Sequence, residues 1–176
     1  MTSLDFIFWL FVFLFAIIGA MRGWAKELLV AAAVILSIFV IRVLETFTPF
    51  IQDLLNGTAR FWFRAAILLA LVFFGYQTPK LPPLAASGRF VRERIQDMLL
   101  GFFLGALNGY LVFGTLWYFL DQAKYPFPAI SAPDPATAAG QAALKLIPYL
   151  PPAILGTPAI YFAVALAFVF VLVVFI

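Results

Sequence analysis

The sequence contains neither cysteine nor histidine among its 176 residues. Without cysteine the chain cannot form disulfides, zinc thiolate sites or iron–sulfur clusters. Without histidine it lacks the commonest protein ligand of haem and copper and the usual general base of enzymes. The sequence also has no serine–base pair, no phosphate-binding glycine loop and no paired-carboxylate motif. We therefore expect a protein that is not an enzyme and that binds no metal or cofactor.

Charged residues are scarce as well. Asp, Glu, Lys and Arg make up 11% of the chain, and the formal net charge is +3. The basic residues stand near the ends of apolar stretches rather than in one patch, so we expect no nucleic-acid partner. Hydrophobic residues make up 65% of the chain, and the mean hydropathy is +1.08. A soluble domain of this length could not bury so much apolar surface, so the expected surroundings are a lipid bilayer.

The chain offers about five apolar stretches that could cross a bilayer core of about 30 Å as helices. The stretches are continuous rather than alternating, which favours helices over a β-barrel. The sequence therefore predicts an all-α, polytopic transmembrane helical bundle of about five spans plus interfacial amphipathic helices. The expected spans are Phe6–Met21, Leu28–Ile41, Phe61–Tyr76, Met98–Leu120 and Ala159–Ile176. The second is short, but its helix can extend through Lys26 and Arg42 if their side chains reach to the membrane surface.

The expected organisation has three parts. Residues 1–120 would form a four-helix membrane core, 121–158 a Pro- and Ala-rich connector, and 159–176 a C-terminal transmembrane helix. In the connector, Asp134–Pro135 can start a short amphipathic helix that ends at Ile147. Another amphipathic helix is expected within Arg42–Gly57, with Thr48–Pro49 as its N-cap and first helical position. The alternative for Arg42–Gly57 is a connector that is ordered only by its neighbours.

Glycines recur at helical spacing in two of the expected spans. Gly101, Gly105 and Gly109 stand at positions i, i+4 and i+8 of the fourth span, and Gly19 and Gly23 repeat this spacing where the first span ends. Such glycines let two backbones approach closely, which membrane helices need because lipid provides no hydrophobic drive between them. We predict a helix-packing seam here, within the chain or against a partner. The alternative is that glycine is simply common in membrane helices.

Asn108 is the one strongly polar side chain deep inside an expected span. An unpaired amide is costly in lipid, so we expect Asn108 to face inward and to bond a neighbouring helix. A transport site is the alternative, with Pro148–Pro158 lining the same path. The expected spans carry no ionisable residue away from their ends, which argues against proton-coupled transport and voltage sensing. The many Phe residues are expected on lipid-facing surfaces rather than around a pigment or quinone.

The distribution of Lys and Arg gives the expected orientation. With five spans, six basic residues fall on one side and five on the other, and the side with more of them is expected to be cytoplasmic. The N-terminus would then lie outside and the C-terminus inside. The larger group is Arg22, Lys26, Lys80, Arg89, Arg92 and Arg94. Asp97 follows Arg94 by three residues, a spacing at which an exposed ion pair can form on a helix.

Two segments resemble the colicin V production protein family. One runs from Asp5 through the apolar stretch into Gly19–Leu28, and the other is Arg94 followed by Leu99–Gly109. The first resembles the family's opening helix and its Gly-x-x-Arg-Gly-aromatic turn, and the second resembles its glycine-spaced helix. Asn108 departs from the family pattern, in which a basic residue often precedes the last glycine. The resemblance implies a bacterial inner-membrane protein with a core of about four helices, associated with export of a peptide toxin, and it supplies no catalytic residue.

Two functions are compatible with these observations. The first is a non-catalytic accessory subunit that packs against larger subunits of an inner-membrane complex through its glycine-lined helices. Such a complex could be photosynthetic, respiratory or otherwise engaged in electron transfer, although this chain would hold no redox cofactor. The alternative is an export accessory similar to the family's namesake, or a pore-forming or transport component. Its expected partners are the lipid bilayer and, in the first case, other membrane-protein subunits.

Overall fold

The computed structural model describes residues 4–48, 51, 57–77 and 90–175, and this part of the chain contains helices and connections but no β-strand. Four helices are long and apolar enough to cross a membrane: α1 (Leu4–Arg22), α2 (Trp24–Phe47), α4 (Gly57–Tyr76) and α5 (Phe90–Gln122). The predicted all-α bundle of a polytopic membrane protein is therefore confirmed. The shorter apolar helix α8 (Ala159–Phe175) follows three short elements, α6 (Ala138–Leu146), η1 (Ile147–Tyr149) and α7 (Pro151–Ile154).

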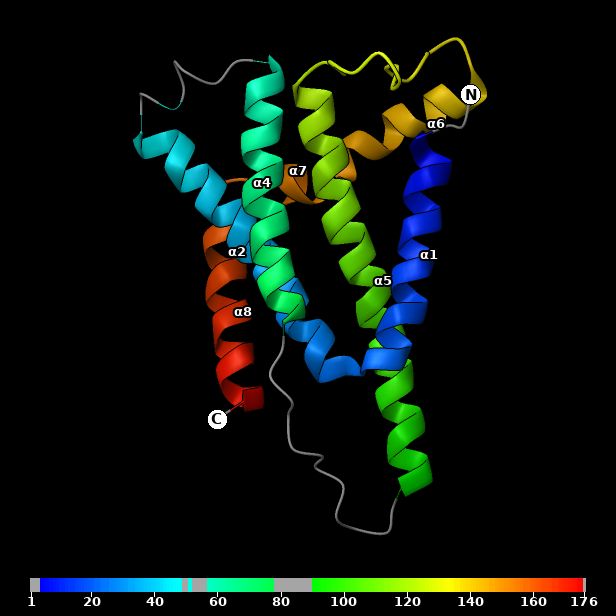
Figure 1. Ribbon diagram of the computed structural model, residues 1–176, viewed down its shortest axis with the longest axis vertical. Helices are drawn as coiled ribbons and strands as arrows, with labels where there is room; N and C mark the ends of the chain where they lie inside the picture. The colour runs from blue at the N-terminus through cyan, green and yellow to red at the C-terminus, as the bar shows by residue number, and fades with distance from the viewer. Residues whose placement is uncertain (1–3, 49–50, 52–56, 78–89, 176) are drawn as a thin grey trace.

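The long helices alternate in direction along the bundle (Figure 1). We call the end that carries Leu4 and α6 the upper end, and the end that carries the α1–α2 turn at Gly23 the lower end. α1 and α4 run downward, α2 and α5 run upward, and α5 extends below the α1–α2 turn (Figure 1). α1 packs against α5, whereas α2 packs against α4, α5 and α8.

The main core forms around α2 because its apolar residues recur at helical spacing on more than one face. Val30, Val34 and Ile38 are almost completely buried, and they pack in one cluster with Leu68 of α4 and Ile160 of α8. A second cluster joins the upper ends of α1 and α5 to the α6–α7 segment. Its buried members are Phe8, Trp117, Ala143 and Leu150.

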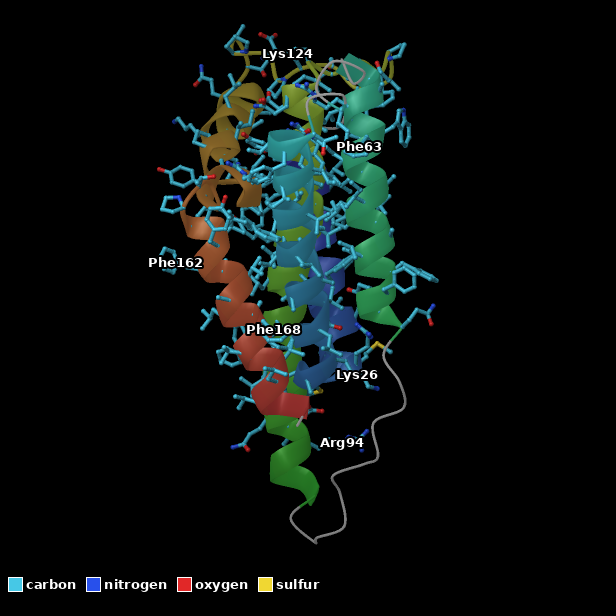
Figure 2. The ribbon with its side chains drawn as sticks, turned by 90° about the vertical axis from the view of Figure 1, so that its left-hand side faces the viewer. Lys26, Phe63, Arg94, Lys124, Phe162 and Phe168 are labelled. Atoms are coloured by element: carbon cyan, nitrogen blue, oxygen red, sulfur yellow. The ribbon has the colours of Figure 1, made fainter. Side chains whose placement is uncertain are left out.

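Large apolar side chains also cover the outside of the bundle, as expected for helices in lipid. Phe162 and Phe168 are 74% and 63% exposed, and they project sideways from α8 (Figure 2). The charged residues labelled in the same view lie toward the ends, with Lys124 at the top and Lys26 and Arg94 toward the bottom (Figure 2). This separation matches a hydrocarbon layer bounded by two polar surfaces.

The second span is longer than the sequence suggested. The helix α2 continues past Ile41 to Phe47, and the backbone N–H of Thr48 donates to the Leu44 carbonyl, 3.1 Å away, at its C-terminal end. The expected separate amphipathic helix is therefore wrong for Arg42–Phe47, while residues 49–50 and 52–56 lie outside the described residues. The helix tolerates its polar positions because α4 supplies a partner: the Arg64 guanidinium makes two hydrogen bonds to the Glu45 carboxylate.

Two other helices begin at different residues than expected. α5 begins at Phe90 rather than Met98, so the charged residues that were expected before this span belong to its helix. The connector helix α6 starts later than expected, at Ala138, because the Thr137 hydroxyl accepts a hydrogen bond from the Gly140 N–H and caps it. The fifth expected span is the 17-residue α8, shorter than the four long helices.

Candidate functional site

The α1–α2 turn is shaped by a glycine and by a carboxylate from another helix. Gly23 has a φ of +86°, a left-handed conformation that glycine adopts without a steric penalty. The Asp97 carboxylate of α5 accepts a hydrogen bond from the Trp24 N–H at the start of α2, 3.1 Å away. A carboxylate at this position satisfies a helix N-terminal donor and suits the positive end of the helix dipole. Asp97 therefore contacts the α1–α2 turn, and the described residues contain no ion pair between it and Arg94.

Glu27 lies one turn into α2 and is completely buried. Its Oε1 atom is 2.5 Å from a guanidinium nitrogen of Arg22, and its Oε2 atom accepts a hydrogen bond of 2.7 Å from the Asn108 side-chain amide. The same amide nitrogen lies 2.8 Å from the Glu27 backbone carbonyl. Both carboxylate oxygens act as acceptors, which is the arrangement that an ionised carboxylate makes.

Arg22 connects this carboxylate to a fourth helix. Its guanidinium donates to the backbone carbonyl of Tyr76 at 3.3 Å and stands 4.2 Å from the centre of the Tyr76 ring. A guanidinium over an aromatic face gains electrostatic attraction from the ring. Arg22, Glu27, Tyr76 and Asn108 thus come from α1, α2, α4 and α5, and we call them the Glu27 cluster.

The Glu27 cluster lies near the lower ends of α1, α2 and α4, where these helices pack against α5: Arg22 and Tyr76 are the last residues of α1 and α4, and Glu27 stands in the first turn of α2. Asn108 stands eleven residues past Asp97 and thirteen before Asp121, the two acidic residues that bound the uncharged part of α5. At ~1.5 Å per helical residue, this places the Asn108 backbone ~16 Å above Asp97. The Arg22 side chain is 20% exposed and that of Glu27 is fully buried, so the carboxylate carries most of the desolvation cost, which the attraction offsets only when the geometry is good. Removing Arg22 would leave the Glu27 carboxylate buried without a counter-charge.

Most of the glycines that were predicted to form a helix-packing seam meet where α1 crosses α5. A Cβ atom built on Gly19 would lie 2.6 Å from the Gly105 Cα, and one built on Gly101 would lie 3.1 Å from the Gly19 carbonyl carbon. A Cβ on Gly109 would lie 2.8 Å from the Val12 Cα. The structure thus brings Gly19, Gly101, Gly105 and Gly109 into one contact between helix backbones within the chain.

Gly23 takes part in a different contact, because a Cβ there would meet the Asp97 carboxylate, 2.7 Å from Oδ2.

Asn108 lies beside the α1–α5 contact but turns toward α2. The Pro148–Pro158 stretch reaches α5 further up, where a Cβ on Gly114 would lie 2.7 Å from the Pro151 ring. The structure therefore does not bring Asn108 and this stretch together around one path.

The sequence analysis did not identify Glu27 or Tyr76 as site residues. The helix of the second span was expected to extend through Lys26, so Glu27 was expected at its polar end, whereas the structure buries the Glu27 side chain completely. Glu27 stands at a span end, in the first turn of α2, as expected for an ionisable residue, but its burial was not predicted. The sequence signal that could have suggested this ion pair was an acidic residue five positions after Arg22, on the other side of a glycine turn. Local hydropathy could not show that α5 covers it.

These features define a class of protein: a polytopic helical membrane protein in which a buried carboxylate pairs with a partly buried arginine between the long helices. The chain belongs to the colicin V production protein family, whose model matches residues 4–132. The family resemblance of the two sequence segments is thereby confirmed, and the matched range contains the whole Glu27 cluster. Comparisons with curated proteins and with solved structures find no match.

Proposed function

We propose that this chain is a non-catalytic accessory component of peptide-toxin export in the bacterial inner membrane, and that export depends on the Glu27 cluster. The observation that carries the proposal is the Glu27–Arg22 pair, whose carboxylate is fully buried between helices, in a member of the colicin V production family. Ionisable residues inside membrane bundles are costly and are usually retained for function. Helix packing alone could be achieved more cheaply with apolar side chains.

The same family match supports export over the other expected function, a packing subunit of an electron-transfer complex. An accessory role is also better supported than a pore. One pocket lies at the upper ends of α2, α4 and α5 and another beside Asp5, and neither of these is lined by Asn108. The proposed orientation keeps the N-terminus outside and the C-terminus inside.

Secretion of colicin V tests the proposal directly. Cells that carry the colicin V determinants but lack their own family member would express this chain or its variants, and toxin activity in the medium would be measured by growth inhibition. We expect Glu27→Gln and Asn108→Leu to reduce secretion about tenfold or more, since each disrupts the buried pair or its amide partner. Lys145→Gln, an exposed substitution on α6, serves as the control and should secrete like the wild type.

Membrane levels of each variant must be measured in the same cells, because a variant that is degraded would also fail to secrete. Normal secretion by a Glu27→Gln protein that accumulates at the wild-type level would refute the role of the cluster. The purified chain in liposomes provides the second measurement. We expect no ion or solute flux, and a flux that Asn108→Leu abolishes would replace the accessory role with a pore.

A further inference from the structure

A pocket of about 400 Å³ opens between the upper parts of α2, α4, α5 and α7, far from the Glu27 cluster. Its walls include Ile38, Ile41 and Phe119, which are 3%, 4% and 3% exposed and belong to the main core. Its polar lining includes Arg42, Glu45 and Arg64. The pocket is thus apolar on the side of the bundle core and carries guanidinium groups near the upper end.

The charge of Arg64 is matched within the pocket. Its Nε and one terminal nitrogen lie 2.7 and 2.8 Å from the two carboxylate oxygens of Glu45, a bidentate pair. The same guanidinium stands 5.4 Å from the centre of the Phe119 ring. These contacts fix the Arg64 side chain against the pocket wall and neutralise its charge.

Arg42 is held differently. Its guanidinium donates to the Thr157 hydroxyl at 3.2 Å, and within the described ranges no carboxylate lies within 4.0 Å of it. A neutral hydroxyl orients the side chain without balancing its charge. With two arginines and one glutamate among its lining residues, the pocket carries one excess positive charge.

We propose that this pocket binds an anionic phospholipid, with the Arg42 guanidinium on the lipid phosphate and the apolar wall at Ile38 and Ile41 against the acyl chains. Arginine presents several N–H donors in a planar fork that suits phosphate oxygens. The pocket lies toward the end of the bundle where α2 and α4 approach the membrane surface, the depth at which lipid phosphates lie and at which basic side chains are common. The core-side wall favours a lipid over free phosphate because only a lipid supplies matching apolar surface.

The melting temperature of the purified full-length protein in detergent, measured against ligand concentration, tests this assignment. A ligand that binds the folded state raises the melting temperature with concentration, so the titration yields an apparent Kd. The probes are short-chain phosphatidylglycerol and inorganic phosphate. We expect phosphatidylglycerol to stabilise the wild type and Arg42→Gln to weaken its apparent affinity about tenfold, the usual effect of losing one charge-assisted hydrogen bond.

Two further variants keep the outcome interpretable. Gln122→Glu adds a carboxylate at an exposed pocket position and should weaken phosphatidylglycerol binding several-fold without removing a core contact. Lys145→Gln removes one exposed positive charge from the same end and should leave the affinity within about twofold of the wild type. Equal losses in Arg42→Gln and Lys145→Gln would overturn the proposal, because they would show general attraction to a basic surface. Stabilisation by inorganic phosphate equal to that by phosphatidylglycerol would overturn the lipid assignment.

Discussion

At the scale of single residues, the most informative side chain is Glu27. Its two oxygens meet one charged donor and one neutral donor, so Arg22 balances the charge and Asn108 occupies the remaining oxygen. In a medium of low dielectric constant, each of these contacts is stronger than in water, and each unpaired group is more costly. Replacing one member of the pair should therefore lower the free energy of unfolding more than replacing both.

A double-mutant cycle measures this asymmetry. Glu27→Gln keeps the size of the side chain but leaves Arg22 as a partly buried cation without a counter-charge, so we expect it to lower the free energy of unfolding by about 2 kcal/mol, less than for a fully buried pair. The double variant Arg22→Gln/Glu27→Gln should lose less than the single one, because no unpaired charge remains. Unfolding in mixed micelles would give the values, with Lys145→Gln as a control near zero. A double variant that loses the sum of both single effects would show that the two residues are not coupled.

At the scale of helices, the contact between α1 and α5 depends on the absence of side chains. Gly19 and Gly105 face each other so closely that a methyl group on either would meet the backbone of the other helix. Backbone cannot move aside as a flexible side chain can, so the two helices would have to separate. The same crossing determines where the α1–α2 turn lies along α5. It thereby also determines the distance from Glu27 to Asn108.

The variant Gly105→Ala tests this contact. Its Cβ would meet the Phe15 carbonyl oxygen and would lie 2.9 Å from the Gly19 Cα. Alanine is the better helix former by about 1 kcal/mol, yet we expect a net loss of about 2 kcal/mol in unfolding free energy because overpacking outweighs that gain. The matched control is Gly156→Ala, whose Cβ has 3.6 Å to its nearest neighbour and should change stability by less than about 0.5 kcal/mol. Equal stability of both variants would contradict the described crossing.

At the scale of the whole molecule, the arrangement of charge indicates how the bundle sits in a bilayer. Arg94 lies toward the lower end (Figure 2), and α6, which carries the exposed Lys145, lies at the upper end (Figure 1). Exposed aromatic and aliphatic side chains cover the helices between these ends. Such a molecule can cross a membrane in either direction, and the orientation expected from the Lys and Arg count of the whole sequence puts the end that carries Arg22 and Arg94 in the cytoplasm.

Because the chain has no cysteine, single-cysteine labelling determines the orientation without background. We expect Lys145→Cys to react with a membrane-impermeant maleimide added to spheroplasts, and Arg94→Cys to react only after the membrane is opened. The reason for expecting this orientation is the count of Lys and Arg along the sequence, six on the side of Arg94 and five on the other. The opposite pattern would reverse the orientation. Labelling of both positions from one side would contradict the placement of the two residues at opposite membrane surfaces.

The sequence alone determined the class of this protein, because hydropathy is a local sum along the chain and lipid imposes helices on any long apolar stretch. It therefore predicted α1, α4 and the apolar part of α5 to within a few residues. It also predicted that Asn108 would turn inward, although it could not name a partner. Tertiary structure decided that partner: Glu27 is 81 positions away in the chain and becomes buried only because α5 packs beside α2. It likewise decided that α2 continues past Arg42, since Arg64 of α4 pairs with Glu45 there. Contacts between helices depend on their arrangement in space, which no local property of the sequence records.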